Sequence, residues 1–233
     1  VMTRQVVVTG MAGLSPIGLD WPMVFESLKA HRSAVQIMPD WKEIDGLRTH
    51  LAAPIEDFEV PKHYSRKSIR AMGRVSLLAT RATELALEDA GLLGTSHVTG
   101  GRMGVAYGSG TGSPTAHQVF FENLHIHKRL KGISSTTYIK MMSHTCVANL
   151  GNFFKVKGRI IPTCSACTSG SQGIGYAYES IKYGQQDCMI AGGAEELSVS
   201  EAVMFDVLYA TSTKNKNPNQ TPAPFDKNRD GVV

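Results

Sequence analysis

The stretch that decides the fold covers residues 159–184 and reads RIIPTCSACTSGSQGIGYAYESIKYG. It opens with a short apolar run at residues 159–162, which predicts a buried strand. A turn of small residues follows at 163–167, and residues 170–183 have a pattern typical of a helix that Gly184 closes. A strand that leads into a helix through a tight corner is typical of α/β proteins, whose sheets are largely parallel.

The same alternation continues on both sides of this stretch. Apolar runs bounded by glycine or proline at residues 6–9, 103–107 and 188–191 predict three more buried strands. Helical patterns lie at residues 22–30 behind an Asp20 cap, at 67–90 before Gly91, and at 139–151. We therefore expect an α/β protein with a mostly parallel sheet covered by helices on both faces.

The end of the chain is less regular. Polar residues 214–221 predict a long exposed loop, and residues 230–233 read as a turn that leads into a new strand. No linker composition precedes this loop, so we expect one compact unit. A strand that begins at the last residues suggests that more sequence normally follows.

The composition is that of an ordinary globular protein, with 42% hydrophobic and 19% charged residues among 233. It excludes a disordered chain, a collagen-like fibre and a disulfide-stapled miniprotein. No apolar run is long enough to span a membrane, and the first ten residues hold no signal-peptide pattern. We expect a soluble, cytoplasmic protein whose four cysteines are reduced thiols, because four are too few for a disulfide framework.

The net charge of +4 is too small to indicate nucleic-acid binding, but its distribution is uneven. Residues 60–83 carry six basic side chains and no carboxylate, and residues 123–178 carry seven basic side chains and no carboxylate. Two interpretations stay open at this point. These stretches are either solvated helix faces and loops, or a surface that attracts an acidic partner and surrounds the cysteine-containing turn with positive charge.

Two glycine-rich turns resemble nucleotide-binding loops only superficially. Residues 10–16 lack the spacing of the dinucleotide fingerprint and place Pro16 in the loop, and residues 108–112 are followed by Ser113 where the third glycine belongs. We interpret both as tight turns beside closely packed backbone. The sequence predicts no cofactor and no metal.

Cys164 and Cys167 form a single C-x-x-C pair, which is a redox couple in thioredoxin-like proteins and a zinc site only when it occurs twice. The corner between strand and helix favours another role for Cys167, which we expect at the helix N-terminus with its side chain directed outwards. There the helix dipole favours thiolate over thiol, and nearby N–H groups can receive an oxyanion. Cys167 is therefore the candidate nucleophile, and we expect Cys164 to be a small core residue.

Residues 165–170, which read SACTSG, resemble the active-site segment of the elongating β-ketoacyl-acyl carrier protein synthases, and the likeness continues to Ile174 and Gly175. These enzymes perform decarboxylating Claisen condensations in fatty acid synthesis. The likeness extends along essentially the whole chain. It includes VVVTG at residues 6–10, SPIG at 15–18, GSGTG at 108–112, AGGAE at 191–195, STKN at 212–215, PFD at 224–226 and RDG at 229–231.

The resemblance implies a thiolase-like layered αβαβα fold of two similar halves, a homodimer, and a chain of residues 1–233 that forms the N-terminal half. It implies that Cys167 accepts an acyl chain from acyl carrier protein, and that the acyl tunnel includes Thr111 and Phe205. It places a docking patch for the acidic carrier at Lys67 and Arg70; the acid-free stretch adds Lys128, Arg129 and Lys131 as a second arm. The two catalytic histidines, a lysine and a glycine-rich loop of the family would follow Val233.

Two other functions stay open. One is a non-catalytic partner subunit that sets chain length in a heterodimer, although such relatives lack the nucleophile. The other is a redox protein that uses Cys164 and Cys167. The presence of Cys167 weighs against the partner subunit, and thiol titration under mild oxidants would identify the redox protein by a rapid, reversible loss of two thiols per chain.

Overall fold

The computed structural model describes residues 4–233, and they form two compact units. The first unit contains residues 4–12 and Glu59–Glu196, and the second contains Gly13–Phe58 and Leu197–Val233. The expectation of one compact unit is therefore wrong. Each unit is built from segments far apart in the sequence, and none of the three crossings between them has the composition of a linker.

The first unit contains a parallel sheet of three strands in the order β4–β3–β5. Its strands are β3 (Met103–Gly108), β4 (Ile160–Thr163) and β5 (Cys188–Gly193). Gly108 is paired with Thr163 on one side and with Gly193 on the other, so the carboxyl ends of the three strands lie level with one another. The predicted parallel α/β sheet is confirmed. In most sheets of this kind, ligands bind just beyond the carboxyl ends of the strands.

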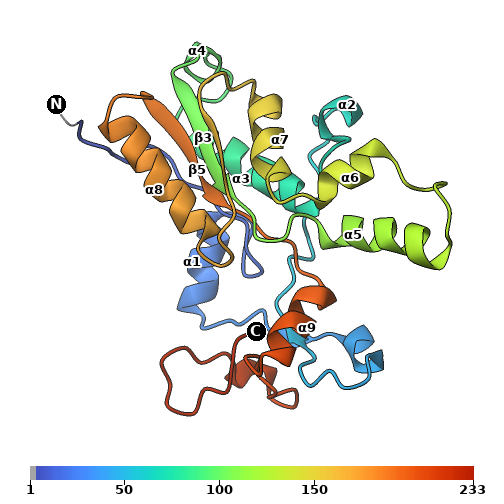
Figure 1. Cartoon of the computed structure of the whole chain (residues 1–233). Coiled ribbons are helices and arrows are strands. Elements are labelled where there is room, and N and C mark those ends of the chain that lie inside the picture. The colour runs from blue at the N-terminus through green and yellow to red at the C-terminus, as the bar shows by residue number, and fades with distance from the viewer. Residues whose placement is uncertain (1–3) are drawn as a thin grey trace. The chain divides into compact units, whose positions relative to one another are not determined.

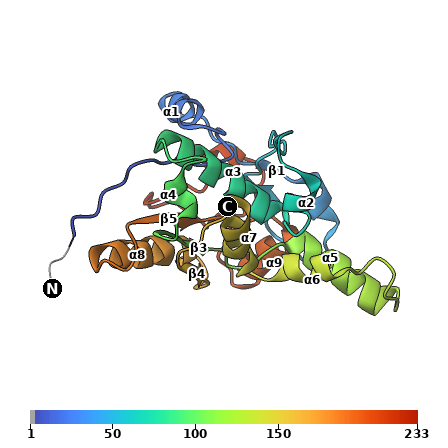
Figure 2. The same cartoon turned by 90° about the horizontal axis from the view of Figure 1, so that it is seen from above.

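Helices cover both faces of this sheet (Figures 1 and 2). On one face lies α7 (Thr145–Phe154), with α3 (Arg74–Asp89) packed against it, and on the other lies α8 (Ser169–Lys182). The apolar core includes Val105 and Leu150, both 0% exposed. Burying side chains of this size contributes about 1.5–3 kcal/mol each, so the core between β3 and α7 is the main source of stability in this unit.

Glycines allow α8 to approach the ends of the strands very closely. A Cβ added at Gly108 would lie 2.6 Å from Ser169, and one added at Gly173 would lie 2.8 Å from the carbonyl oxygen of Ala106. A side chain at either position would push the helix away from the sheet. These glycines therefore fix the N-terminus of α8 beside the end of β3.

The remaining helices of the first unit show two breaks that the apolar pattern does not reveal. The predicted helix at 67–90 is divided into α2 (Arg66–Ile69) and α3, and the predicted helix at 139–151 into α6 (Ser135–Met141) and α7. The break between α2 and α3 contains an apolar turn in which Met72 is buried. The hydrophobic pattern therefore continues through the break and does not reveal it. The other short elements are α4 (Ser96–Thr99), α5 (Pro114–Phe121) and the π-helical turn η2 (Glu122–Ile126).

The second unit contains two helices, a short antiparallel pair of strands and two 3₁₀ turns among its described residues. They are α1 (Trp21–Lys29), β1 (Gln36–Ile37), η1 (Pro39–Glu43), β2 (Leu51–Ala52), α9 (Val199–Val207) and η3 (Pro218–Gln220). The predicted Asp20 cap is confirmed, because its carboxylate accepts a hydrogen bond from the Met23 N–H at 2.8 Å.

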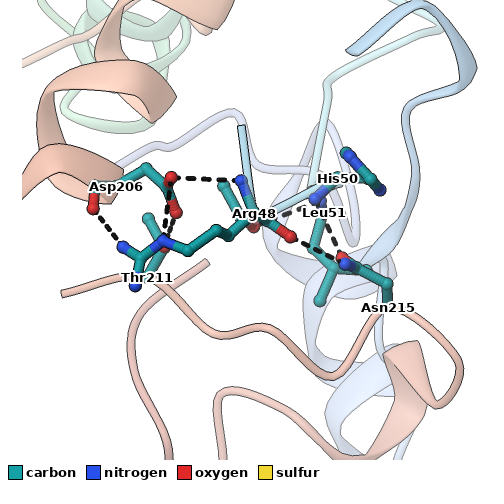
Figure 3. A network of polar contacts seen from close by, with 7 residues as sticks. Arg48, His50, Leu51, Asp206, Thr211 and Asn215 are labelled. Carbon is teal, nitrogen blue, oxygen red and sulfur yellow. Dashed lines mark hydrogen bonds and ion pairs between the residues drawn. The ribbon is translucent and has the colours of Figure 1, made fainter. Parts of the chain in front are cut away.

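A polar network joins the two segments of this second unit (Figure 3). The buried carboxylate of Asp206 accepts hydrogen bonds from the Arg48 N–H at 3.1 Å and from the Thr211 hydroxyl at 2.6 Å. Asn215 accepts from the His50 N–H at 2.8 Å and donates to the Arg48 carbonyl at 2.8 Å. Burial favours a raised pKa for Asp206, but the bonds from Thr211 and Arg48 outweigh it and lower that pKa.

Three predictions about exposure are wrong. Residues 6–9 form no strand, and Val7 and Val8 are exposed, because no strand pairs with them among the described residues. β4 lies at the edge of the described sheet, so Ile160 is exposed rather than buried. The loop at 214–221 is only partly exposed, since Asn215 is held by the network of the second unit.

The turn at 230–233 pairs with a neighbouring segment of the second unit through its backbone. The Val232 N–H donates to the Ala210 carbonyl at 2.8 Å, and the Ser212 N–H donates to the Val232 carbonyl at the same distance. Within residues 4–233, no helix combines the length and the apolar character that crossing a membrane requires.

Candidate active site

The corner between β4 and α8 has the predicted strand–turn–helix form. β4 ends at Thr163 and α8 begins at Ser169, so five residues make the whole turn. Ala166 has a φ of 49°, a left-handed conformation that costs a residue with a Cβ about 1–2 kcal/mol. The chain reverses sharply at Ala166, and the next residue, Cys167, is exposed. Strained residues of this kind are found where a structure holds a reactive group in a fixed position.

Small hydroxyl residues hold the corner together. The Ser169 hydroxyl donates to the Ala166 carbonyl at 2.7 Å and accepts from the Ser165 N–H at 2.9 Å. The Thr168 hydroxyl donates to the Ser165 carbonyl at 2.8 Å, and the Thr163 hydroxyl donates to the Ser169 carbonyl at 2.8 Å. The serines and threonines around Cys167 therefore fix the turn that carries it.

The four cysteines have different environments, and all four are free thiols. Cys146 is 1% exposed, and burial, followed by the negative charge of Glu195, raises the pKa of its thiol to about 12. Burial also raises the pKa of Cys188. Both remain protonated at neutral pH and are poor nucleophiles. Cys164 and Cys167 are the two exposed cysteines of the four.

The expectation that Cys164 is a core residue is wrong. Cys164 follows the last residue of β4, Thr163, which is itself buried, so Cys164 lies outside the core and is exposed. Its thiol donates to the carbonyl oxygen of Gly110 at 3.6 Å. Cys164 therefore joins the corner to the glycine loop that follows β3.

This glycine loop, residues 108–112, is the tight turn that the sequence predicts. Gly112 has a φ of 73°, and a Cβ added there would lie 2.5 Å from the Met141 carbonyl oxygen. The carboxylate of Glu195 accepts from the Gly110 N–H at 2.6 Å and from the Thr111 hydroxyl at 3.0 Å. The loop lies beside the corner, because a Cβ added at Gly110 would be 3.9 Å from the Cα of Ala166.

Glu196 is a buried carboxylate that sequence reasoning missed. It is 1% exposed, and it accepts from the Val75 N–H at 3.2 Å, the Thr115 N–H at 3.3 Å and the Thr115 hydroxyl at 2.6 Å. Val75 and Thr115 lie in the first turns of α3 and α5, where N–H groups have no partner within the helix. Glu196 thus ties the starts of these two helices to the segment after β5.

The family model described as "Beta-ketoacyl synthase, N-terminal domain" matches residues 3–233. The chain belongs to the β-ketoacyl synthase family. It is 36% identical over 231 residues to 3-oxoacyl-[acyl-carrier-protein] synthase 1 of Haemophilus influenzae, and this alignment covers 99% of this chain and 56% of that protein. The chain thus spans about half the length of the curated relatives it matches.

Solved structures agree with this membership. The crystal structure of a β-ketoacyl synthase from Burkholderia phymatum STM815 matches with a TM-score of 0.94 at 51% identity, over 100% of this chain and 56% of that chain. A type II polyketide synthase acyl-carrier protein in complex with its ketosynthase bound to the hexaketide matches with a TM-score of 0.72 at 20% identity. That match covers 88% of this chain and 55% of that chain, and it shows the fold alone. The predicted thiolase-like fold is confirmed, with this chain as its N-terminal half.

The two residues that the family resemblance assigns to the acyl tunnel lie in different units. Thr111 is half-buried in the glycine loop of the first unit, next to the corner that carries Cys167. Phe205 lies in α9 of the second unit and is 39% exposed. Their roles in the tunnel remain predictions.

The basic residues assigned to carrier docking are all exposed in the first unit. Lys67 lies in α2 and Arg70 directly follows it, whereas Lys128, Arg129 and Lys131 lie between η2 and α6. Among residues 4–233, neither Lys67 nor Arg70 forms an ion pair with a carboxylate of the chain. Both charges thus face solvent and are not neutralised by a neighbour.

The segment that leads into α2 is anchored by the buried carboxylate of Glu84 in α3. Glu84 contacts the His63 ring at 2.6 Å and accepts from the Tyr64 hydroxyl at 2.9 Å and from Arg81 at 2.5 Å. Burial favours a raised pKa for Glu84, but the contacts with His63, Arg81 and Tyr64 outweigh it and lower that pKa. Burial and the bond to Glu84 raise the pKa of Tyr64. Sequence reasoning missed Glu84, which is a charged residue inside an ordinary helical pattern.

Proposed function

We propose that this chain is the nucleophile-bearing part of a 3-oxoacyl-[acyl-carrier-protein] synthase, an acyltransferase of fatty acid biosynthesis. The observation that supports this most strongly is the exposed Cys167 directly after the left-handed Ala166, between β4 and α8. It occurs in a chain that matches the N-terminal domain of the β-ketoacyl synthases over residues 3–233.

In the first step, the Cys167 sulfur attacks the carbonyl carbon of an acyl thioester on acyl carrier protein. A new C–S bond forms to Cys167, the C–S bond to the carrier breaks, and the carrier leaves as a thiolate, which takes up a proton and becomes a thiol. The N–H groups of Ser169 and Gln172 already donate to the Ala166 and Thr168 carbonyls, at 3.0 and 2.9 Å, so the positive end of the α8 dipole is what would stabilise the oxyanion of the tetrahedral intermediate. Thiolates attack thioesters readily, so no cofactor is needed.

In the second step, malonyl carrier protein loses carbon dioxide, and the resulting carbanion attacks the Cys167 thioester. A C–C bond forms, the C–S bond to Cys167 breaks, and Cys167 is released as a thiolate. The family resemblance assigns this step to two histidines and a lysine beyond Val233, and the eight histidines of this chain lie outside the family's His-Gly-Thr and Gly-His settings. The complete condensation therefore belongs to the full-length protein.

The same proposal includes the partners. Acyl carrier proteins are strongly acidic, and the exposed Lys67 and Arg70 offer charges of the opposite sign. The full-length protein is expected to be a cytoplasmic homodimer, in keeping with the family it resembles.

The test is to incubate the full-length protein with acyl carrier thioester and to map the acylated residue by peptide mass spectrometry. We expect the adduct on Cys167, and we expect Cys167→Ser to abolish it while thermal unfolding is unchanged, because the substitution is nearly isosteric. Cys164→Ser is the matched control, since Cys164 is also an exposed cysteine and lies three residues away. An adduct on Cys164 or Cys188 would refute the assignment.

The exposure of both Cys164 and Cys167 also supports a second candidate, a dithiol redox protein. Its reaction would join the two sulfur atoms in a disulfide and pass two electrons and two protons to a mild oxidant such as a small disulfide. Thiol titration distinguishes the candidates. Rapid, reversible loss of two thiols per chain without any acyl acceptance would favour the redox protein.

A further inference from the structure

The side chain of Gln172 reaches back from the first turn of α8 to the corner that carries Cys167. Its Oε1 atom accepts a hydrogen bond from the Ser165 hydroxyl at 2.9 Å, and its Nε2 group donates to the Tyr176 hydroxyl at 3.4 Å. Its backbone N–H donates to the Thr168 carbonyl at 2.9 Å and belongs to the regular helix. Gln172 therefore joins the helix to the turn that precedes it.

The hydroxyl that Gln172 binds also closes the turn around Cys167. The Thr168 hydroxyl donates to the Ser165 carbonyl at 2.8 Å and to the Ser165 hydroxyl at 3.0 Å. These two residues stand directly before and after Ala166 and Cys167. A serine hydroxyl has one proton, and Gln172 takes the proton of Ser165, so the Ser165 oxygen stays turned towards Thr168. The bond to Gln172 therefore orients the group that ties the two ends of the turn together.

Ala166, inside this turn, has a conformation that its neighbours must hold in place. Its φ of 49° is left-handed, and such a residue keeps its conformation only when several contacts fix it. On the helix side, the Ala166 carbonyl accepts from the hydroxyl and the N–H of Ser169 at 2.7 and 3.0 Å. On the strand side, the side chain of Ser165 is held by Thr168 and Gln172. Loss of the bond to Gln172 would leave the turn less fixed.

The packing of α8 does not depend on this side chain. α8 packs on the sheet through Gly173 and Ala177, which are buried, whereas Gln172 and Ser165 are half-buried. A hydrogen bond between neutral groups that water can reach contributes little to the free energy of folding, because water replaces it when it breaks. The bond between Gln172 and Ser165 therefore acts mainly on the geometry of the corner.

We propose that Gln172 is a positioning residue for acyl transfer to Cys167. By orienting the Ser165 hydroxyl, it holds the turn closed and keeps the Cys167 sulfur in one place relative to the positive end of the α8 dipole. The attack on a thioester needs this arrangement, because its oxyanion must form where the dipole stabilises it. The inference rests on the proposed function, since it assumes that Cys167 attacks a thioester. Gln172 itself does not touch the reacting atoms and acts through Ser165.

The experiment compares wild type, Gln172→Leu, Ser165→Ala and the double variant, all in the full-length protein. Leucine is close to glutamine in size but has no atom that accepts the Ser165 proton. Two rates are measured on Cys167 by peptide mass spectrometry: acylation by acyl carrier thioester, and alkylation by iodoacetamide, which forms no oxyanion. Gln118→Leu is the matched control, because Gln118 is an exposed glutamine of α5 in the same unit.

We expect Gln172→Leu to slow acylation about fivefold, as the loss of one neutral hydrogen bond would do, and to leave alkylation at the wild-type rate. Ser165→Ala should slow acylation at least as much. Adding Gln172→Leu to Ser165→Ala should have no further effect, because both substitutions break the same bond. Thermal unfolding should be unchanged in both single variants, and Gln118→Leu should behave like wild type.

The remaining outcomes each contradict one of the two ideas. Wild-type protein whose Cys167 is alkylated but never acylated would overturn the proposed function and, with it, this inference. Normal acylation of wild type together with an unchanged rate in Gln172→Leu or Ser165→Ala would overturn the inference alone. Equal slowing of acylation and alkylation, or a loss of folding, would show that Gln172 supports the structure and that the inference is wrong. A further loss in the double variant would also overturn it, because Gln172 would then not act through Ser165.

Discussion

The central strand of the sheet, β3, and the corner between β4 and α8 are held by different forces, although they belong to the same unit. All six residues of β3 are buried, and Val105 of this strand and Leu150 of α7 have no exposed surface. The corner has an exposed cysteine at its tip, and hydrogen bonds among small hydroxyl residues keep its shape. Substitutions in the core should therefore change stability, and substitutions at the corner should change chemistry.

The largest expected effect is in the core. Leu150→Ala in the full-length protein should lower the free energy of unfolding by about 2–5 kcal/mol, because the cavity left behind α7 adds to the lost burial. Denaturant titration followed by a probe in the first unit measures this loss. The folded variant should still be acylated on Cys167 at the wild-type rate. A rate that falls in proportion to the stability loss would contradict the separation between core and corner.

A second prediction concerns the buried carboxylate of Glu84, which joins α3 to the segment before α2. Its pKa is lowered in the folded state, so its contribution to stability is present above the pKa of an unfolded glutamate, about 4.3, and is lost as the pH falls through the folded value. Glu84→Gln should cost about 1–3 kcal/mol at neutral pH, and the difference from wild type should shrink towards pH 3.

Unfolding by denaturant between neutral pH and pH 3 measures the difference in stability between wild type and Glu84→Gln. Glu88→Gln serves as the control, because Glu88 lies on the exposed face of the same helix. A gap between wild type and Glu84→Gln that stays constant down to pH 3 would show that the ionised carboxylate does not stabilise the fold.

A third prediction tests whether the corner adjoins the acyl tunnel. Thr111→Phe should shorten the longest acyl chain that Cys167 accepts, because a large ring would replace a half-buried side chain beside the corner. Wild type should admit medium to long chains. Acylation with carrier thioesters of increasing length measures the limit, and an unchanged limit would mean that Thr111 does not line the tunnel.

The sequence allowed prediction of those features that depend on neighbouring residues. The corner at Cys167 follows from a strand, a run of small residues and a helical pattern within 26 residues, from 159 to 184. The same local reasoning predicted the Asp20 cap and a sheet whose strands run parallel. Motifs in the right order along the chain identified the family before any contact was known.

The remaining features depend on contacts between distant segments. The bonds from Glu195 to the glycine loop connect residues 84 to 86 positions apart, and nothing in the local pattern predicts them. Cys164 was misplaced because one residue beyond the end of a strand is enough to take a side chain out of the core. The two units were missed because each is assembled from segments that are separate in the sequence.

The smallest effect is expected at the docking residues Lys67 and Arg70. Their charges are exposed, so neither burial nor a fixed hydrogen-bond network holds them. Lys67→Glu with Arg70→Glu should raise the apparent KM for carrier-bound substrate and leave the reaction with a small acyl thioester unchanged. The effect should be largest at low ionic strength, because the Debye length falls from about 10 Å at 0.1 M to about 3 Å at 1 M salt. Steady-state kinetics with both substrates at several salt concentrations tests this. Equal losses with both substrates would mean that Lys67 and Arg70 support the fold around α2, and the docking assignment would then have to be abandoned.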